Sequence, residues 1–190
     1  GVECAGEAEV VGGALVKWAS MQSSHLEGTM GIVCERAERL LSGNGPVVRV
    51  MTGSWIVHPN VRAEGSIWRS DGTHELHRYV PGPDTEADYD TSPMKRVHDT
   101  EQAVRINVVK SKGTAEDFPI IQQLREEGYT DYLALPMPFS DGSLKVATFA
   151  TKAPGGFAKP HLSVFESLMR PLALVCELKT LRRTAETVLD

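Results

Sequence analysis

Two apolar runs joined by a short turn constrain the fold of this chain more than any other segment. Residues 131–139 and 144–151 are extended and apolar, and residues 140–143 between them read Ser-Asp-Gly-Ser, which suits a hairpin turn. In the second run Thr148 lies on one face and Phe149 on the other, and both faces are otherwise largely apolar. A strand of this kind needs cover on both sides, so the sequence predicts a central antiparallel sheet between two layers.

Further strands are predicted before this hairpin. The Asp-Gly pair at 71–72 suits a tight turn, and residues 66–70 and 74–80 flank it as an antiparallel pair. Residues 47–51 and 104–108 are short apolar runs that also fit strands. Together these segments predict a sheet of five to six strands.

Helical patterns precede the sheet and interrupt it. Residues 8–41 repeat apolar side chains at helical spacing in two pieces. Ser92 followed by a proline predicts a short helix to about Asp99, because serine caps a helix and proline fits its first turn. Residues 118–127 fit another helix, whereas residues 81–90 have the composition of an exposed loop. The predicted class is α+β, with the terminal helices on one face of the sheet and a loop and short-helix excursion on the other.

The last segment, residues 160–190, predicts a helix that outgrows the domain. Pro171 lies far enough inside it to kink the helix or to mark where its packing on the core ends. Beyond this proline, apolar residues recur at alternating spacings of four and three, the seam along which two parallel helices pair. The dimer-interface candidates are Leu174, Leu178, Leu181, Ala185 and Val188. A terminal helix docked on its own core is the alternative interpretation.

Composition and charge exclude several classes of protein. The 190 residues are 41% hydrophobic and 24% charged, which fits one domain with an extension. The formal charge of -5, with 20 basic residues scattered among 25 acidic ones, argues against a nucleic-acid surface. No apolar run approaches the ~20 residues of a membrane span, and the N-terminus lacks a signal sequence, so a cytoplasmic location is expected.

Catalytic and metal-binding motifs are not found in the sequence. Cys4, Cys34 and Cys176 are far apart and form no disulfide or zinc pattern, so reduced thiols are expected. The chain contains no nucleotide-binding glycine loop, esterase elbow or zinc-protease motif. His74 and His77 are three residues apart on a predicted strand, so they point to opposite faces and cannot share one metal ion. The sequence therefore predicts no catalytic residue and no metal site.

Four segments together resemble a known family. They are DYLALPMPFSDGS at residues 131–143, VATFAT at 146–151, GGF at 155–157 and LALVCELKTLRRTAETVLD at 172–190. With the order of predicted elements, they resemble a GAF domain, the family of small-molecule and light sensors. In particular they resemble the N-terminal sensory region of bacterial class III adenylate/guanylate cyclases. The resemblance begins near Trp55 and is strongest after Asp131.

The resemblance implies a regulatory role. Residues 1–170 would form a GAF-like sensory domain that binds a small molecule, and residues 171–190 would begin a homodimeric coiled coil that leads into an attached cyclase domain. In those cyclases a segment similar to residues 181–190 leads directly into the catalytic domain, so no catalytic residue is assigned here. The ligand, the sign of regulation and adenylate or guanylate specificity stay open, and the sequence requires no cofactor.

The candidate ligand-binding residues come from the predicted strands and from the excursion. Aromatic walls with a few polar tips suit small organic ligands. Seven residues are candidates for such a wall: Trp68, His77, Tyr79, His98, Phe118, Tyr132 and Thr148. Ordinary sheet packing is the alternative for each aromatic residue, and solvation or helix capping is the alternative for His98.

Two other functions stay open. Some GAF-like proteins resemble peroxide or sulfoxide reductases, so a small thiol enzyme using Cys34 or Cys176 is one alternative, provided that the thiols share a pocket. A dimerisation module whose cavity is filled by its own side chains is the other. A ligand retained by the purified protein favours the sensor, and thiol labelling tests the enzyme.

Overall fold

The computed structural model describes residues 47–58, 61–71, 73–79 and 82–189. The helices predicted over residues 8–41 lie outside the described residues. Within the described ranges the order is three strands, two helices, a strand, a helix, two strands and a final helix. This order is the predicted one, with one additional helix.

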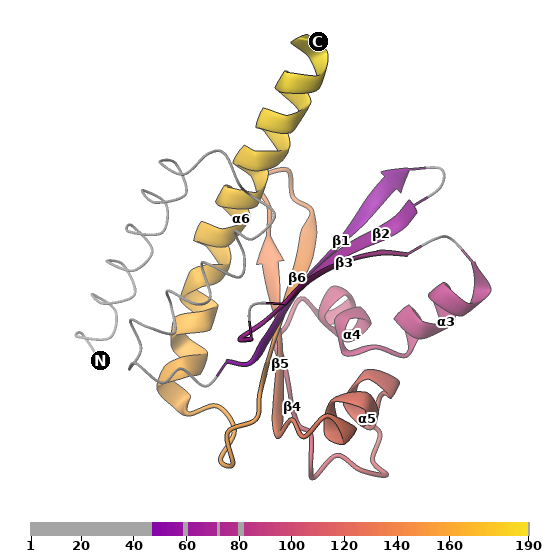
Figure 1. Cartoon of the computed structure of the whole chain (residues 1–190), viewed down its shortest axis with the longest axis vertical. Helices are drawn as coiled ribbons and strands as arrows, with labels where there is room; N and C mark the ends of the chain where they lie inside the picture. Colours follow the sequence, from indigo (N-terminus) through magenta and orange to yellow (C-terminus); the bar gives the residue numbers. More distant parts are fainter. Residues whose placement is uncertain (1–46, 59–60, 72, 80–81, 190) are drawn as a thin grey trace.

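The strands form one antiparallel sheet. Their bounds are β1 (Arg49–His58), β2 (Val61–Arg69), β3 (His74–Tyr79), β4 (Val104–Asn107), β5 (Asp131–Pro138) and β6 (Leu144–Thr151). Their order across the sheet is β3-β2-β1-β6-β5-β4, so β1 and β6 are central (Figure 1). The predicted antiparallel sheet of five to six strands is confirmed.

The hairpin of β5 and β6 forms where the sequence predicts it, and the two strands pair along their whole length. In the turn, Oδ1 of Asp141 accepts a hydrogen bond from the amide of Ser143 at 2.9 Å. Gly142 has φ 81°, a conformation that glycine adopts readily because it lacks a Cβ. The turn residues thus contribute the contacts that their composition predicts.

β1 and β2 are longer than the sequence predicts. The pattern indicated strands only at 47–51 and 66–70, whereas β1 pairs with β2 as far as His58. The missed stretch places Gly53 opposite Gly65, and glycine has a low strand propensity. Pairing with β6 on the other side of β1 supplies hydrogen bonds that local propensity does not reveal.

Three short helices form the excursion: α3 (Pro83–Asp90), α4 (Pro93–Thr100) and α5 (Pro119–Glu126). α4 begins as predicted, since Oγ of Ser92 accepts a hydrogen bond from the amide of Lys95 at 3.2 Å. α3 shows that the prediction of a loop over residues 81–90 is wrong. Pro83 occupies the first turn of α3, and the acidic residues that follow suit the positive end of the helix dipole.

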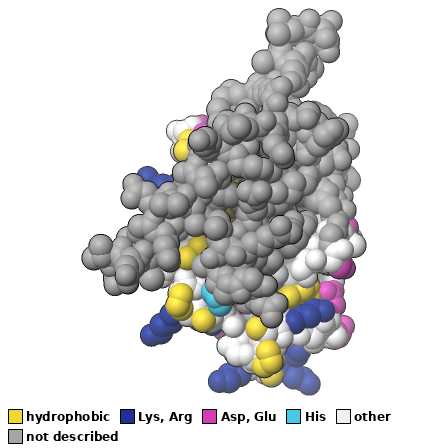
Figure 2. Space-filling view, turned by 60° about the vertical axis from the view of Figure 1, so that its left-hand side comes forward, with side chains coloured by type: hydrophobic (Ala, Val, Ile, Leu, Met, Phe, Trp, Pro, Cys, Tyr) yellow, Lys and Arg dark blue, Asp and Glu magenta, His cyan; other side chains and the backbone are white. Residues whose placement is uncertain are grey.

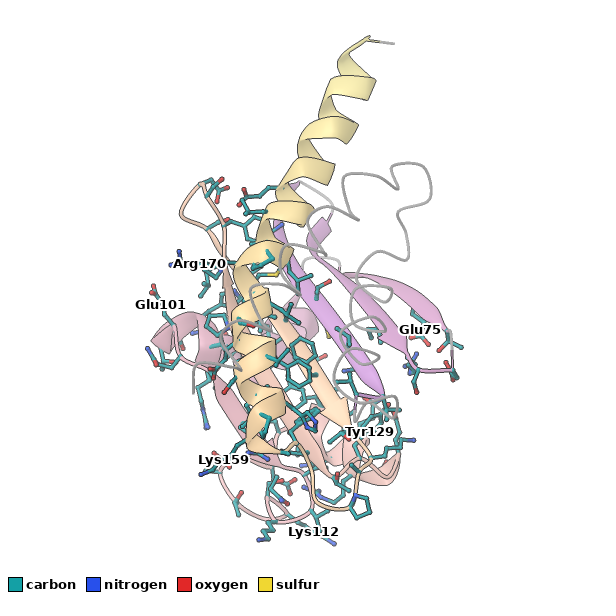
Figure 3. The ribbon with its side chains drawn as sticks, turned by 90° about the vertical axis from the view of Figure 1, so that its left-hand side faces the viewer. Glu75, Glu101, Lys112, Tyr129, Lys159 and Arg170 are labelled. Atoms are coloured by element: carbon teal, nitrogen blue, oxygen red, sulfur yellow. The ribbon has the colours of Figure 1, made fainter. Side chains whose placement is uncertain are left out.

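Helix α6 (Lys159–Leu189) packs on one face of the sheet (Figure 1). In Figure 3 it crosses the strands from Lys159 at one end of the sheet and past Arg170. Phe165 of α6 stacks on Phe149 of β6, with ring centroids 4.6 Å apart and an interplanar angle of 10°. The core under α6 includes Val50, Leu133, Leu135, Met137, Leu168, Leu172 and Ala173.

The excursion covers the other face of the sheet (Figure 1). There α4 and α5 contribute to a second apolar core, which includes Val97, Ile106, Ile121, Leu124, Tyr132 and Val146. Alternate residues of β6 therefore belong to different cores, with Phe149 under α6 and Ala150 under the excursion. The prediction that both faces of the sheet are covered is confirmed.

An ion pair between the buried Asp131 and the exposed Arg105 ties the entry of α6 to the sheet. Asp131 at the start of β5 is 2% exposed, and Oδ2 accepts hydrogen bonds from Arg105 Nη2 at 2.7 Å and from the amide of Phe157 at 2.9 Å. Arg105 Nη2 also donates to the carbonyl oxygen of Phe157 at 2.7 Å. Gly156 passes so close that a Cβ built on it would lie 2.5 Å from Oδ2 of Asp131. The GGF segment is thus a packing feature that joins β4, β5 and α6.

Candidate ligand-binding site

Two long polar side chains flank a small residue on the face of the sheet covered by the excursion. Arg49 of β1 and Tyr132 of β5 both lie opposite Ala150 of β6 in register. Directly paired residues share a face, and Tyr132 and Ala150 belong to the second core. Because neighbouring strands are about 5 Å apart, roughly 10 Å separates the Cα atoms of Arg49 and Tyr132. We call these three residues the floor of the site.

Thr148 lies in the next row along the strands, between Met51 of β1 and Ala134 of β5. It is 1% exposed, and its buried Oγ1 lies close enough to the Tyr132 hydroxyl to lower the pKa of that phenol, although it makes no hydrogen bond of good geometry in the part of the chain that the structure describes. Burying a hydroxyl without a partner costs about 1–3 kcal/mol by protein mutational data. Thr148 therefore holds an unused hydrogen-bonding group beside the floor.

Arg49 is a buried cation that meets no carboxylate among the described residues. It is 5% exposed, and its Nη2 reaches Sδ of Met51 at 4.0 Å, a weak hydrogen bond. Burial is the main cause of a lowered pKa for Arg49, and the like charge of Arg69 acts in the same direction. Arg69 lies opposite Arg49 in register but donates to Glu75 at 2.6 Å. Of this pair of arginines, Arg49 is the one that forms no ion pair with a described carboxylate, although the charge of Glu127 acts on it from a distance.

Tyr132 contributes a neutral phenol to the floor. It is 2% exposed, and burial raises the pKa of Tyr132 to about 12, against the opposing influence of the Arg49 charge and the Thr148 hydroxyl. Burial also raises the pKa of Tyr129, which lies at the end of the sheet where β5 begins (Figure 3). Near pH 7 the floor and Thr148 therefore offer one positive charge and neutral hydroxyls, which can hold a polar or anionic group.

His98 links the excursion to the sheet. Its Nδ1 is 2.7 Å from the hydroxyl of Tyr89 in α3, and its Nε2 is 3.1 Å from the carbonyl oxygen of Leu144 in β6. A neutral ring with its proton on Nε2 satisfies both contacts, since Nε2 donates to Leu144 and Nδ1 accepts from Tyr89. His98 therefore positions α3 and α4 on β6, and its contact with a ligand stays a prediction.

Phe118 precedes α5 and is half-buried against the second core. The guanidinium carbon of Arg96 lies 5.1 Å from its ring centroid, in the range of a cation–π contact. Arg96 also donates to Glu116 at 3.3 Å. These contacts of Phe118 are with the excursion itself, so its role in a ligand wall stays a prediction.

The other three candidates lie on β2 and β3, and their side chains are outside the described residues. Register places Trp68 opposite Val50, which belongs to the core under α6. His77 and Tyr79 lie in rows of β3 that continue across β2 and β1 on the excursion-facing side. The ligand contacts of all three stay predictions.

Among the described residues, no group of three or more His, Cys, Asp and Glu side chains is placed to hold a metal ion. Cys4, Cys34 and the side chain of Cys176 lie outside the described residues, so the thiol-enzyme alternative stays open.

Within the described residues, none of the helices combines the length and hydrophobicity that a bilayer span needs. On the face shown in Figure 2, the described Lys and Arg side chains are interspersed with hydrophobic and uncharged atoms rather than gathered in one patch.

Arg49 is the site residue that sequence reasoning missed. It interrupts the apolar run 47–51, and a charged residue in the middle of a buried strand is unusual unless it has a partner. That interruption is the signal that could have identified it. The partners that define its surroundings lie about one hundred residues later in the chain, on β5 and β6.

No protein-family model matches the chain, and no curated protein matches it. Solved structures do resemble it. The GAF domain of a phosphoenolpyruvate-protein phosphotransferase from Coxiella burnetii has a TM-score of 0.59 at 12% identity, over 94% of this chain and 97% of its own. The phycoerythrobilin-bound GAF domain of a cyanobacterial phytochrome gives 0.57 at 15% identity, over 93% and 97%.

The GAF domain of a two-component sensor histidine kinase from Bacillus halodurans is a third such structure. It has a TM-score of 0.55 at 15% identity, over 80% of this chain and 95% of its own. The chain therefore has the GAF fold, and the predicted GAF-like α+β architecture is confirmed. At these identities the likeness defines the fold and leaves the function to the site and to α6.

Proposed function

We propose that this chain is a dimeric sensory domain that binds a small organic molecule and regulates a class III adenylate or guanylate cyclase domain joined to the end of α6. Two structural neighbours support the sensory part, since one is the GAF domain of a sensor histidine kinase and another holds phycoerythrobilin. The cyclase part is supported by the resemblance of residues 131–190 to the sensory region of such enzymes. Because fold alone does not define function, the proposal rests on features of the chain.

Helix α6 carries the proposal, because it continues well beyond the core that it covers. Among the side chains that the structure describes, Ala173 is the last residue of α6 in that core, and residues 174–189 extend the helix by about 24 Å at 1.5 Å per residue. Figure 1 shows these turns projecting past the sheet. A helix that only stabilised this domain would not need such an extension, whereas a helix that carries a signal to another domain would.

The predicted dimer seam begins on the side of α6 that faces away from the sheet. Leu174 follows Leu172 by two residues, so it lies about 200° further around the helix axis. Leu172 is 2% exposed, whereas Leu174 is 51% exposed. The remaining seam positions fall within about 40° of the direction of Leu174: Leu178, Leu181, Ala185 and Val188. A second copy of α6 packed along this line would cover the exposed leucine.

A direct contact joins the site strands to α6 near the point where the helix leaves the core. In the turn between β5 and β6, the amide and Oγ of Ser140 both donate to the carboxylate of Glu177, the hydroxyl at 2.7 Å. The same two strands carry Tyr132 and Thr148. A ligand that binds one packing of these strands more tightly than another would bias α6, by no more than its difference in affinity for the two packings.

The test joins the chain in frame, directly after α6, to the catalytic domain of a class III adenylate cyclase. Seven residues inserted after Leu189 nearly preserve the heptad phase, whereas two residues turn the following helix by about 200°. We expect cyclic AMP synthesis to stay within about twofold after the seven-residue insertion and to fall more than about tenfold after the two-residue insertion. The isolated catalytic domain is the control. Equal activity of the two insertion variants would rule out a relay through α6.

A further inference from the structure

We infer that the excursion-facing side of the sheet binds the carboxylate of a small organic acid, with the guanidinium of Arg49 as its main contact and the hydroxyls of Tyr132 and Thr148 as further donors. This inference rests on the proposed sensory function and names the chemical class of its ligand. It follows from the unpaired charge of Arg49, the convergence of three polar groups on one face, and the local balance of charge.

The unpaired state of Arg49 is the first step. A buried guanidinium is normally held by carboxylates or by several hydrogen bonds, because an unpaired charge is costly in the interior. Even less buried arginines of this chain have such a partner: the exposed Arg105 meets Asp131 at 2.7 Å, and the half-buried Arg125 meets Asp117 at 2.6 Å. Arg49 is more deeply buried than either and has only the sulfur of Met51 at 4.0 Å among the described residues. Its planar donor fork therefore has no oxygen acceptor among the described residues, and its geometry suits the carboxylate of a ligand.

The second step is convergence. Oγ1 of Thr148 is buried without a partner in the described residues, and Tyr132 lies across Ala150 from Arg49. Ala150 and Ala134 belong to these two rows, and their side chains, which end at Cβ, are packed in the second core. Three polar side chains thus come from three adjacent strands to one face, each at most 5% exposed.

The third step is the balance of charge, which favours a carboxylate over a phosphate. Arg69, the neighbour of Arg49 in register, is already neutralised by Glu75 at 2.6 Å. The charge of Glu127 also acts on Arg49, but no described carboxylate forms an ion pair with Arg49. One carboxylate therefore matches its charge, whereas a phosphate monoester brings between one and two negative charges near pH 7. The rest of the ligand would lie near the second core, so an apolar body suits it.

The test uses the 190-residue chain, freed of any retained ligand by unfolding and refolding, and compares it with Arg49→Met. Methionine keeps most of the length of the side chain and removes the charge. Isothermal titration calorimetry is run with benzoate and hexanoate as the acids, benzamide as the neutral control and inorganic phosphate as the competing anion. We expect the wild type to bind at least one of the acids and not to bind benzamide. We expect Arg49→Met to bind that acid at least about tenfold more weakly than the wild type does.

Thermal unfolding without ligand gives an independent readout. An arginine kept for a ligand leaves an uncompensated charge in the empty site, so Arg49→Met is expected to raise the melting temperature. A purely structural arginine would lower it when replaced. Arg49→Lys keeps the charge without the fork, and we expect it to bind the acid with an affinity between those of the wild type and Arg49→Met.

The outcomes separate this inference from the proposed function. The inference is overturned if the wild type binds neither acid, if Arg49→Met binds them as tightly, if Arg49→Met melts at a lower temperature, or if phosphate binds more tightly than both acids. A neutral molecule recovered from the purified protein, and still bound by Arg49→Met, overturns the inference but keeps the sensor. Acid binding that depends on Arg49, combined with equal activity of the two insertion variants, keeps the inference and removes the relay.

Discussion

The buried polar residues in the described part of the chain fall into two groups. Asp131 is paired with Arg105, and Oγ1 of Thr151 accepts a hydrogen bond from a backbone amide at 3.0 Å. Arg49 and Thr148 have no comparable partners among the described residues. An unpaired buried group costs stability, whereas a partner offsets much of the cost of burial. We therefore expect the first group to serve folding and the second to serve binding.

Replacing Thr148 with valine tests this division. Valine has nearly the same shape and removes the unpaired hydroxyl, so Thr148→Val is expected to stabilise the ligand-free protein by about 1 kcal/mol. Thr151→Val is the matched control, because it removes a hydroxyl that has a partner and is expected to destabilise by a similar amount. Urea unfolding followed by circular dichroism measures both. A loss of stability in Thr148→Val as large as that in Thr151→Val would contradict the division.

Gly156 gives a second prediction for a single residue. It has φ 69°, and its nearest neighbour for a new Cβ is the fixed carboxylate of Asp131, at 2.5 Å. Gly113 has φ 73° and nothing within 4 Å, so Gly113→Ala measures backbone strain alone. We expect Gly156→Ala to cost at least about 1 kcal/mol more than Gly113→Ala in the free energy of unfolding. Equal costs would mean that the Asp131 contact gives way freely.

Elements formed as predicted where the local signals agree. α4 has a serine cap and a proline in its first turn, and the hairpin of β5 and β6 has both alternation and a turn sequence. The prediction failed over residues 81–90, where polar composition concealed a helix start, and over the far part of β1, where glycine concealed a strand. In both places the interactions that determine the structure, a proline at a helix start and pairing with β6, leave no periodic pattern of hydrophobic residues in the sequence.

The candidate site could be predicted only in part. The strand pattern places Tyr132 and Thr148, and the register then brings both to one face with Ala150. The burial of Arg49 depends on pairing with β6, about one hundred residues away in sequence, so local reasoning could not find it. The hydrogen bonds of His98 are equally non-local, since one of its partners is Leu144.

The contact between the β5–β6 turn and α6 can be tested at the level of these elements. Glu177→Ala removes the acceptor for the Ser140 amide, so hydrogen exchange of that amide is expected to accelerate about tenfold or more. The amide of Phe139, which donates to the carbonyl oxygen of Ser143 at 2.9 Å, should change little. Glu166→Ala, an exposed glutamate on the same helix, is the control. Unchanged exchange at Ser140 would show that the turn is not held by α6 in solution.

For the whole molecule, the proposal requires two chains to meet along α6. Leu174 and Val109 are the large hydrophobic side chains most exposed among the described residues, at 51% and 60%. They belong to different elements. Leu174 lies on α6, where it begins the heptad series, and Val109 lies in the loop that follows β4. Single exposed apolar residues are common, so only the heptad context makes Leu174 informative.

A charge at each position gives a matched pair of variants. Leu174→Glu places a carboxylate in the proposed seam and is expected to weaken dimerisation at least about tenfold. Val109→Glu makes the same kind of change outside the seam and should leave the association unchanged. Sedimentation equilibrium of the 190-residue chain measures both. A monomeric wild type, or equal effects of the two variants, would remove the dimeric part of the proposal.

The two faces of strand β6 contact different layers of the domain. Thr148 lies on the excursion-facing side, where we propose that a ligand binds, and its neighbour Phe149 stacks on Phe165 of α6. These two residues are adjacent in one strand. A ligand that shifts or tilts β6 would therefore also move the ring of Phe149 against Phe165 of α6. Ligand selectivity and the packing of α6 consequently depend on two consecutive residues of one strand. A substitution that alters one of these properties is expected to alter the other.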